Sequence, residues 1–400
     1  MFLFGVITSV LCLILVIFSG FIYNILIGEG DHKLVLIIVL ISVPFVVTYS
    51  LIEAFLRSLQ EINMIVKVSI ISNIISTLIF IPLIYFYGML GVAIYLLCFG
   101  FLPFSVFIFL NKKRFLNFFV KTKDNLEKYH LNRIYKIGVV SLFSSLLHQG
   151  VLILIRRFII NNYGLVEMGV YQSVLSVSVN FFAVIYIFFS TYTLPKISGY
   201  KDNSSIVTEL NDNFRFLLFI IIPLVAILYT YREFIIFIFF SKEFSKASEL
   251  LLFQLIGDIF RTSAALFGLW LIPKMKIIQL FMIDFTFNLL LYILPVFLLN
   301  YVDKNLYTIP ISYMISFFIH FILFFIYSVY FLKFKFDKKT LETLLYSIAF
   351  LIICLFISYY FKNIGYYISI LILTVWFILI VKKDEKMKLF RLLIRKNIIK

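Results

Sequence analysis

The sequence predicts an all-α polytopic membrane protein, and three observations support this fold class. Of the 400 residues, 63% are hydrophobic and 14% are charged, and the mean hydropathy of +1.07 lies outside the range of soluble globular domains. Apolar runs of about 20 residues, the length that a transmembrane helix needs, recur along the whole chain. The alternating pattern of a membrane β-barrel does not appear, and only helices or closed barrels satisfy their backbone in lipid.

Twelve apolar runs have the length of a membrane-spanning helix, so the sequence predicts about 12 transmembrane helices. These runs span residues 2–27, 34–56, 65–87, 89–110, 137–159, 169–194, 215–240, 250–272, 277–300, 308–332, 343–361 and 364–381. The first run begins at Met1 with no basic region before it and no small-residue cleavage site after it. A removable signal peptide is therefore not expected.

A long basic loop divides the runs into groups of four and eight, and it is expected to join two lobes. The predicted parts are an N-terminal lobe of four helices (1–110), a basic cytoplasmic linker (111–136), a C-terminal lobe of six helices (137–333), two additional helices (334–381) and a basic cytoplasmic tail (382–400). The linker and the tail place aromatic or aliphatic residues among basic ones, a pattern typical of segments that lie on a membrane surface. A solvated tail is an equal alternative for 382–400.

The basic residues indicate how the chain is oriented in the membrane. The formal net charge is +16, and most of the 36 Lys and Arg residues fall in loops on one side, including the linker and the tail. Cytoplasmic loops carry such an excess, so both termini are predicted to be cytoplasmic. The positive net charge therefore reflects the orientation of the chain in the membrane and its contact with anionic membrane lipids. This argues against nucleic acid as a partner.

The eighth run carries the most informative polar residues of the chain, Gln254, Asp258 and Arg261. Their spacing of i, i+4 and i+7 places all three on one face of a helix. Ionised groups are costly in hydrocarbon, so such a pair normally faces a bundle interior or a wet cavity and marks a transport pathway. The alternative is a structural ion pair that holds two helices together.

A second polar stripe lies on the fifth run, where Gln149 and Arg156 stand seven residues apart on one helical face and Arg157 follows. Arginine near a helix end can extend to the membrane interface, and this interpretation competes for Arg157. For Arg156 we expect a cavity. A guanidinium group there would attract an anion, and its planar shape suits phosphate oxygens.

Signals for an enzyme, a metal or a cofactor are missing from the sequence. Cys12, Cys98 and Cys354 lie in apolar runs without the spacing of a zinc site or of a disulfide framework. The chain has no phosphate-binding glycine loop, no nucleophile elbow and no long external loop that could hold paired catalytic carboxylates. We therefore expect a protein that is not an enzyme and that carries no cofactor and no metal.

Two blocks of residues resemble the Wzx-type O-antigen flippases. The first block comprises Arg156, Asn161, Asn162, Tyr163, Gly164, Val166, Glu167, Gly169, Tyr171 and Gln172, and then Tyr192, Leu194, Pro195, Lys196 and Ile197. The second comprises Arg232 to Phe234, Phe240 to Phe244, Phe253 to Asp258, and Phe267 with Gly268. The resemblance covers about 137–330 well and 1–110 more loosely, and it is strongest to the branch that handles the lipid carrier of enterobacterial common antigen.

This resemblance implies a fold, a cargo and partners. The fold would be that of the multidrug/oligosaccharidyl-lipid/polysaccharide exporter superfamily, with two helical lobes around a central cationic cavity. The cargo would be an undecaprenyl pyrophosphate-linked oligosaccharide in the bacterial inner membrane, with a polysaccharide polymerase and a chain-length regulator as partners. Family members begin with two further helices, so the first lobe is expected to have four helices where the family has six.

The resemblance also implies roles for single residues. Arg156 falls where the family places a cavity arginine, while Gln254 and Asp258 match its Gln-Leu-x-Gly-Asp motif. Arg261 departs from the pattern, because a relative has a lysine one position earlier. The predicted substrate-binding residues are Arg156, Arg157 and Arg261 for the pyrophosphate, Gln149, Gln172 and Gln254 for sugar hydroxyls, and Asp258 to tune Arg261 or to take up a coupling cation.

The leading hypothesis is a flippase for a lipid-linked saccharide that works by alternating access. A cation-coupled exporter of small drugs on the same fold is the first alternative, although it would more naturally use acidic groups in its cavity. A polysaccharide polymerase or glycosyltransferase would need a long external loop with catalytic residues. A structural membrane scaffold would not need a charged pair within a helix.

Overall fold

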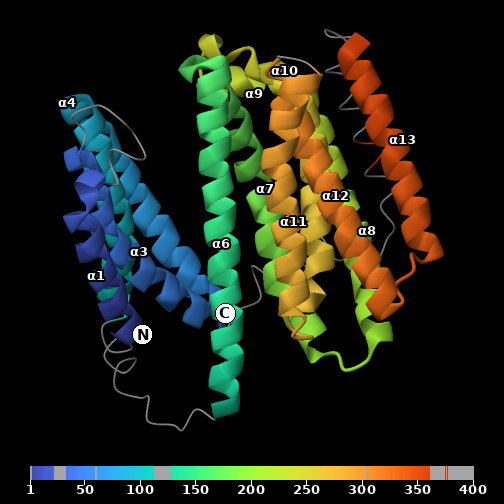
Figure 1. The fold of residues 1–400 in the computed structure, drawn as a ribbon, viewed down its shortest axis with the longest axis horizontal. Coiled ribbons are helices and arrows are strands. Elements are labelled where there is room, and N and C mark those ends of the chain that lie inside the picture. The colour runs from blue at the N-terminus through green and yellow to red at the C-terminus, as the bar shows by residue number, and fades with distance from the viewer. Residues whose placement is uncertain are drawn as a thin grey trace. The chain divides into compact units, whose positions relative to one another are not determined.

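The computed structural model describes residues 2–21, 33–58, 61–111, 128–302 and 305–360, together with 374 and 376, and the described chain divides into two compact units, Met1–Leu126 and Glu127–Lys400. Helices make up nearly all of the described chain (Figure 1). Most of the predicted linker 111–136, most of the last predicted span 364–381 and the tail 382–400 lie outside the described residues.

The first unit contains α1 (Phe2–Ile17), α3 (Lys33–Ser58) and α4 (Ile62–Leu110). α3 packs against both α1 and α4. Four residues form its buried apolar core, namely Ile52, Leu56, Val68 and Phe107. The three helices account for the first four predicted spans.

α4 is a helical hairpin and not one long rod. A straight helix of 49 residues would be about 74 Å long, more than twice the hydrocarbon thickness. The chain reverses at Gly88, whose φ of 52° is a left-handed conformation that glycine adopts without a steric penalty. The rings of Phe80 and Tyr95 lie 4.5 Å apart across the hairpin, and a Cβ at Gly91 would overlap the carbonyl oxygen of Leu83. The two predicted runs 65–87 and 89–110 are therefore two separate passes.

The second unit contains the longer bundle. Its helices are α6 (Lys128–Tyr163), α7 (Leu165–Gly199), α8 (Asn203–Thr230), α9 (Arg232–Phe239), α10 (Ala247–Gly268), α11 (Ile277–Tyr301), α12 (Thr308–Leu332) and α13 (Lys338–Tyr360), with short 3-10 turns at Lys242–Phe244 and Leu269–Leu271. α10 lies at the centre and packs against α7, α8 and α12, while α11 joins α12 to α6 and α13 covers α8.

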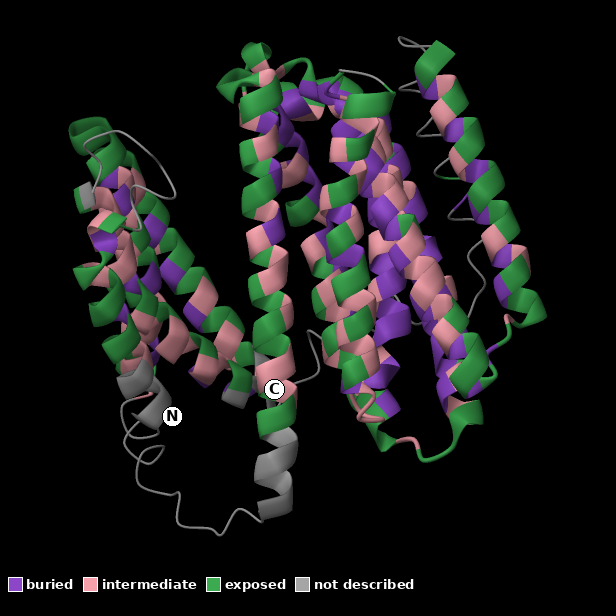
Figure 2. Ribbon diagram, in the orientation of Figure 1, coloured by how far each residue is buried: buried purple, intermediate pink, exposed green. Residues whose placement is uncertain are grey.

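Burial follows this arrangement. Figure 2 shows the buried positions concentrated on the inner helices of the second unit, whereas α6 and α13 carry long exposed stretches. In the most apolar window of α8, 72% of the residues are buried, and in that of α6 only 6% are. An apolar helix that is exposed in this way suits contact with acyl chains. By length and composition, nine of the described helices could cross a membrane, with the α4 hairpin counted as one. The predicted all-α polytopic fold class is confirmed.

The predicted run 215–240 differs from the structure at both ends. α8 begins earlier, at Asn203, because the Asp202 carboxylate accepts a hydrogen bond from the Ser205 backbone N–H at 2.8 Å and caps the helix. Hydrogen bonds from Ser204 and Ser205 lower the pKa of Asp202 below its usual range. The helix ends at Thr230, and α9 continues as a separate element.

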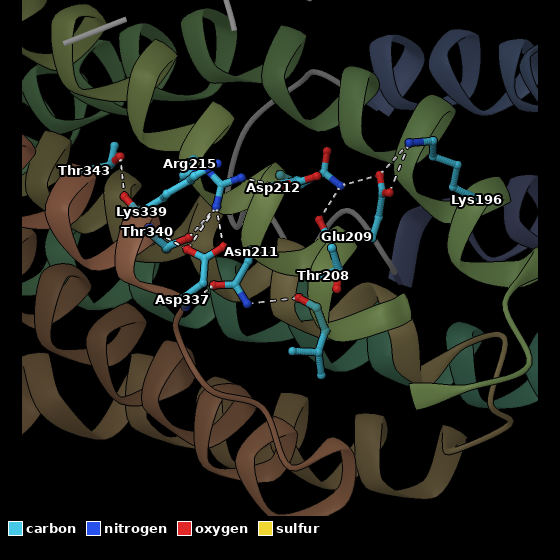
Figure 3. A network of polar contacts seen from close by, with 12 residues as sticks. Lys196, Thr208, Glu209, Asn211, Asp212, Arg215, Asp337, Lys339, Thr340 and Thr343 are labelled. Atoms are coloured by element: carbon cyan, nitrogen blue, oxygen red, sulfur yellow. Dashed lines mark hydrogen bonds and ion pairs between the residues drawn. The ribbon is translucent and has the colours of Figure 1, made fainter. Parts of the chain in front are cut away.

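A polar network holds α13 to α8 (Figure 3). Arg215 on α8 donates to both carboxylate oxygens of Asp337, at 2.7 and 3.0 Å, and to Thr340 at 2.9 Å, and it also pairs with Asp212. Asn211 closes the network, since its side chain donates to the Lys335 carbonyl and accepts from the Asp337 backbone N–H. The network fixes the connection between α12 and α13 at the end of the bundle that carries several of the basic loops.

Candidate functional site

The central polar site forms around α10, which presents Gln254, Asp258 and Arg261 toward α7 and α12. Asp258 is fully buried, and its carboxylate accepts three hydrogen bonds: from Ser178 at 2.6 Å, from Tyr313 at 2.8 Å and from Arg261 at 3.3 Å. Burying a carboxylate is costly unless it is paired and hydrogen-bonded, and here every neighbour is a donor. The site therefore ties three helices together through one acid.

Gln254 lies one turn from Asp258 and is equally buried. Its amide nitrogen donates to the Ser178 hydroxyl at 3.3 Å, and its oxygen accepts from the Tyr171 hydroxyl at 3.4 Å. Gly257 makes this packing possible, because a Cβ at that position would come within 2.6 Å of the Tyr313 ring. The glycine allows α12 to approach α10 closely enough for Tyr313 to reach Asp258.

Arg261 lies at the edge of this polar cluster and not inside it. Its guanidinium donates to Asp258 and to the Tyr313 hydroxyl, at 3.3 and 3.2 Å, and it lies 5.0 Å from the centre of the Tyr186 ring. The Arg261 side chain keeps 22% of its surface exposed, whereas the carboxylate behind it has none. The buried acid thus holds a cation at a partly open surface.

Two cavities of the second unit meet at Arg261. The first has a volume of about 370 Å³ and is lined by Arg156 of α6 and by Gln172 and Asn180 of α7, together with Arg261. The second has a volume of about 380 Å³, and its lining includes Asp284 of α11. Three residues line both cavities, namely His148, Arg261 and Phe317. Arg261 is therefore in contact with both cavities.

Three residues that line the second cavity, with Asn288 next to them, look unremarkable in the sequence when each is taken alone. His320 on α12 lies 3.3 Å from Asp284 on α11, measured from Nε2 to Oδ1. His148 on α6 lies 2.8 Å from Asn288 on α11, measured from Nδ1 to Oδ1. The i, i+4 spacing of Asp284 and Asn288 is visible in the sequence, but the two histidines come from other helices. Only the tertiary structure brings these four residues together.

The predicted site residues occupy three different environments. Arg156, Gln172 and Arg261 line the first cavity. Gln254 and Asp258 are buried behind the wall and line neither cavity. Gln149 and Arg157 are exposed on α6 and also line neither. The cavities therefore bring together three of the seven predicted residues, and two more lie directly behind them.

Comparison with protein families identifies the chain. The family described as "Polysaccharide biosynthesis protein" matches residues 1–249, which is more than half of the sequence. The protein belongs to this family. The match includes α7, the first cavity residues Arg156 and Gln172, and the start of α10.

Curated relatives support the membership over a shorter region. The "Lipid III flippase" of Escherichia coli strain K12 is 27% identical over 142 residues, and that of Shigella flexneri matches equally. The aligned region covers 36% of this chain and 34% of the relative. The match thus spans about a third of the length of these relatives.

Solved structures agree with the family assignment at the level of the fold. "Lipid II flippase MurJ" in its inward closed conformation gives a TM-score of 0.65 at 20% identity and covers 93% of this chain and 80% of that one. A MATE protein in its bent conformation gives 0.68 at 11% identity, with 82% and 75% covered. A MOP superfamily transporter from Pyrococcus furiosus gives 0.67 at 13%, with 82% and 77% covered. The fold of this polysaccharide biosynthesis protein is thus that of polytopic flippases and exporters.

Proposed function

We propose that this protein is a flippase that moves an undecaprenyl pyrophosphate-linked oligosaccharide, such as an O-antigen repeat unit, across the bacterial inner membrane by alternating access. One observation carries the proposal: Arg156 and Arg261, from two different helices, line one cavity of the second unit, which is open at the exposed Arg156. Two guanidinium groups at a shared cavity favour a ligand with several anionic oxygens. A lipid III flippase among its relatives and a lipid II flippase among the structures with a similar fold support this choice of cargo.

The physical task is to carry a pyrophosphate and sugars through hydrocarbon. Ionised and hydroxyl groups lose several kcal/mol each when they leave water without partners, so a polar cavity lowers this barrier. In the proposal, Arg156 and Arg261 bind the pyrophosphate and Gln172 bonds sugar hydroxyls, while the prenyl tail stays in lipid.

The buried residues behind the wall would position the binding groups. The Asp258 carboxylate accepts hydrogen bonds from Arg261 and from the Tyr313 hydroxyl. The Tyr313 hydroxyl in turn accepts one from Arg261. Gln254 and Ser178 hold the acid in turn. Asp258 and Gln254 therefore have no direct contact with the substrate in this proposal. The sequence had led us to expect that Gln254 contacts sugar hydroxyls, and the proposal drops that role. Gln149 and Arg157 are assigned no contact either.

The orientation of the chain is part of the same proposal. The turns that follow α7, α10 and α12 carry Lys201, Lys274 and Lys333, and a cytoplasmic location for them follows from the positive-inside rule. Both termini would then be cytoplasmic. A polymerase and a chain-length regulator would act on the cargo after it reaches the external leaflet.

The test compares two adjacent arginines on the same helix. Arg156→Ala removes a cavity cation, and Arg157→Ala is the matched control because Arg157 is equally exposed but lines neither cavity. We expect Arg156→Ala to reduce surface polysaccharide export at least about tenfold, since a hydrogen bond to a charged group contributes about 1.5–3 kcal/mol. Export is measured by surface polysaccharide per unit of membrane-inserted protein.

Arg157→Ala should export like the wild type. Equal export by both variants at equal protein level would remove the cavity from the proposed function. The MATE-like fold also allows a drug exporter, and this alternative predicts that Arg156→Ala changes drug susceptibility while surface polysaccharide stays constant.

A further inference from the structure

Two imidazole rings of the second cavity stack on Phe287. The ring centre of His320 lies 4.3 Å from that of Phe287 at an interplanar angle of 20°, and that of His148 lies 6.2 Å away at 27°. Each histidine also bonds to a different residue of α11, namely Asp284 or Asn288. Ring orientation is therefore fixed for both histidines by stacking and by a hydrogen bond.

The hydrogen bonds determine the tautomer of His148. The amide nitrogen of Asn288 donates to the Asp284 carbonyl at 2.7 Å, so its oxygen is the atom that faces His148. An amide oxygen can only accept, which means that Nδ1 of His148 carries a hydrogen. The partner of His148 is thus a neutral amide oxygen.

His320 is placed differently because its partner is an acid. Its Nε2 lies 3.3 Å from the Asp284 carboxylate, which accepts the hydrogen on that nitrogen. The other ring nitrogen, Nδ1, is buried and has no hydrogen-bond partner among the residues that the structure describes. His320 is 9% exposed and lines the cavity. The ring therefore has a buried nitrogen without a hydrogen-bond partner on one side and a carboxylate on the other.

We propose that His320 and Asp284 form a proton-binding site that couples proton movement to transport through the neighbouring cavity. Imidazole is the side chain that exchanges a proton most readily near neutral pH, and ionisable residues within membrane spans commonly form proton relays. The proton would bind at Nδ1 of His320, and the resulting imidazolium would be paired with Asp284. The inference rests on the proposed transport function, but the proton site itself can be tested without it.

The surrounding charges indicate the direction of the coupling. The titratable groups that line this cavity from the other helices are Asp284 of α11, His148 of α6, Tyr186 of α7 and Arg261 of α10. With His320 neutral, Asp284 is a negative charge in the cavity that Arg261 also lines. Protonation of His320 cancels that charge and leaves the cavity more favourable for an anionic headgroup. Proton and pyrophosphate binding should therefore strengthen each other, and the linkage is reciprocal.

The first experiment tests the proton site alone. The chain has four histidines, so ¹⁵N-histidine NMR of the purified protein gives few signals, and His320→Gln assigns the one from His320. We expect this signal to change from the neutral to the doubly protonated form as the pH is lowered. Asp284→Asn should shift the change to lower pH, because the imidazolium loses its counter-charge. A His320 ring that stays neutral at every pH at which the protein remains folded overturns the proposal.

The second experiment tests the coupling with undecaprenyl pyrophosphate as the probe, without sugars. Its affinity is measured at about pH 6 and about pH 8, on either side of the usual range for imidazole. The wild type should bind more tightly at the lower pH, and His320→Gln and Asp284→Asn should lose this difference. Glu249→Gln is the matched control, because Glu249 is an exposed carboxylate on α10 outside both cavities. It should keep the pH dependence.

The possible failures separate the two proposals. Unchanged pH dependence in both His320→Gln and Asp284→Asn overturns the coupling while leaving the flippase intact. Wild-type protein that binds no undecaprenyl pyrophosphate at either pH contradicts the proposed function and the coupling. In that case a normal NMR titration of His320 would still support the proton site itself.

Discussion

Replacing Asp258 with alanine should destabilise the second unit strongly. The carboxylate is fully buried and is the acceptor for Ser178, Tyr313 and Arg261. Its removal leaves a guanidinium group beside the cavity without its counter-charge and two hydroxyls without an acceptor. Breaking a buried pair by removing one partner typically costs about 3–5 kcal/mol. At about 2–4 °C per kcal/mol for a unit of this size, the unfolding temperature should fall by about 10 °C.

The assay is thermal unfolding of the purified protein in detergent, followed by intrinsic fluorescence. Glu249→Ala is the control, because it removes an exposed carboxylate from the first turn of the same helix. Adding Arg261→Gln to Asp258→Ala should recover part of the loss, since the unpaired cation is then gone and the two effects are not additive. An Asp258→Ala protein that unfolds within about 2 °C of the wild type would refute this account of the buried acid.

Two further predictions concern packing and capping. Gly257→Ala should destabilise the protein by about 1–3 kcal/mol, because the added Cβ would press on the Tyr313 ring and overpacking has a cost of this size. Thermal unfolding measures this loss. The control is Gly138→Ala, where an added Cβ meets nothing within 4 Å, and it should not lower the unfolding temperature. Asp202→Asn should make stability depend less on acid pH. The pKa of Asp202 is lower in the folded state than in the unfolded state. The carboxylate therefore stabilises the fold at a pH above its unfolded-state pKa, and this stabilisation is lost as the pH falls through its folded-state pKa. Unfolding temperatures from pH 7 to about pH 3 test this, and identical acid profiles for variant and wild type would contradict it.

Several features of the site follow from the sequence. The spacing of Gln254, Asp258 and Arg261 places them on one helical face, and the structure has them there. The presence of Arg156 in an apolar run indicated a cavity, and it lines one together with Gln172. The sequence did not separate residues that face a cavity from those behind its wall, because helical periodicity gives a direction but not the depth of the neighbouring helix.

Hydropathy determined the fold class and most of the spans, because the thickness of a bilayer requires about 20 consecutive apolar residues in each helix, and such runs can be read from the sequence. It could not place the reversal at Gly88 or the break between α8 and α9, which depend on single backbone conformations and caps. The tertiary structure alone decided that His320 meets Asp284 and that Tyr313 reaches Asp258. These pairs join different helices, and their distances depend on how closely small residues such as Gly257 allow the helices to pack.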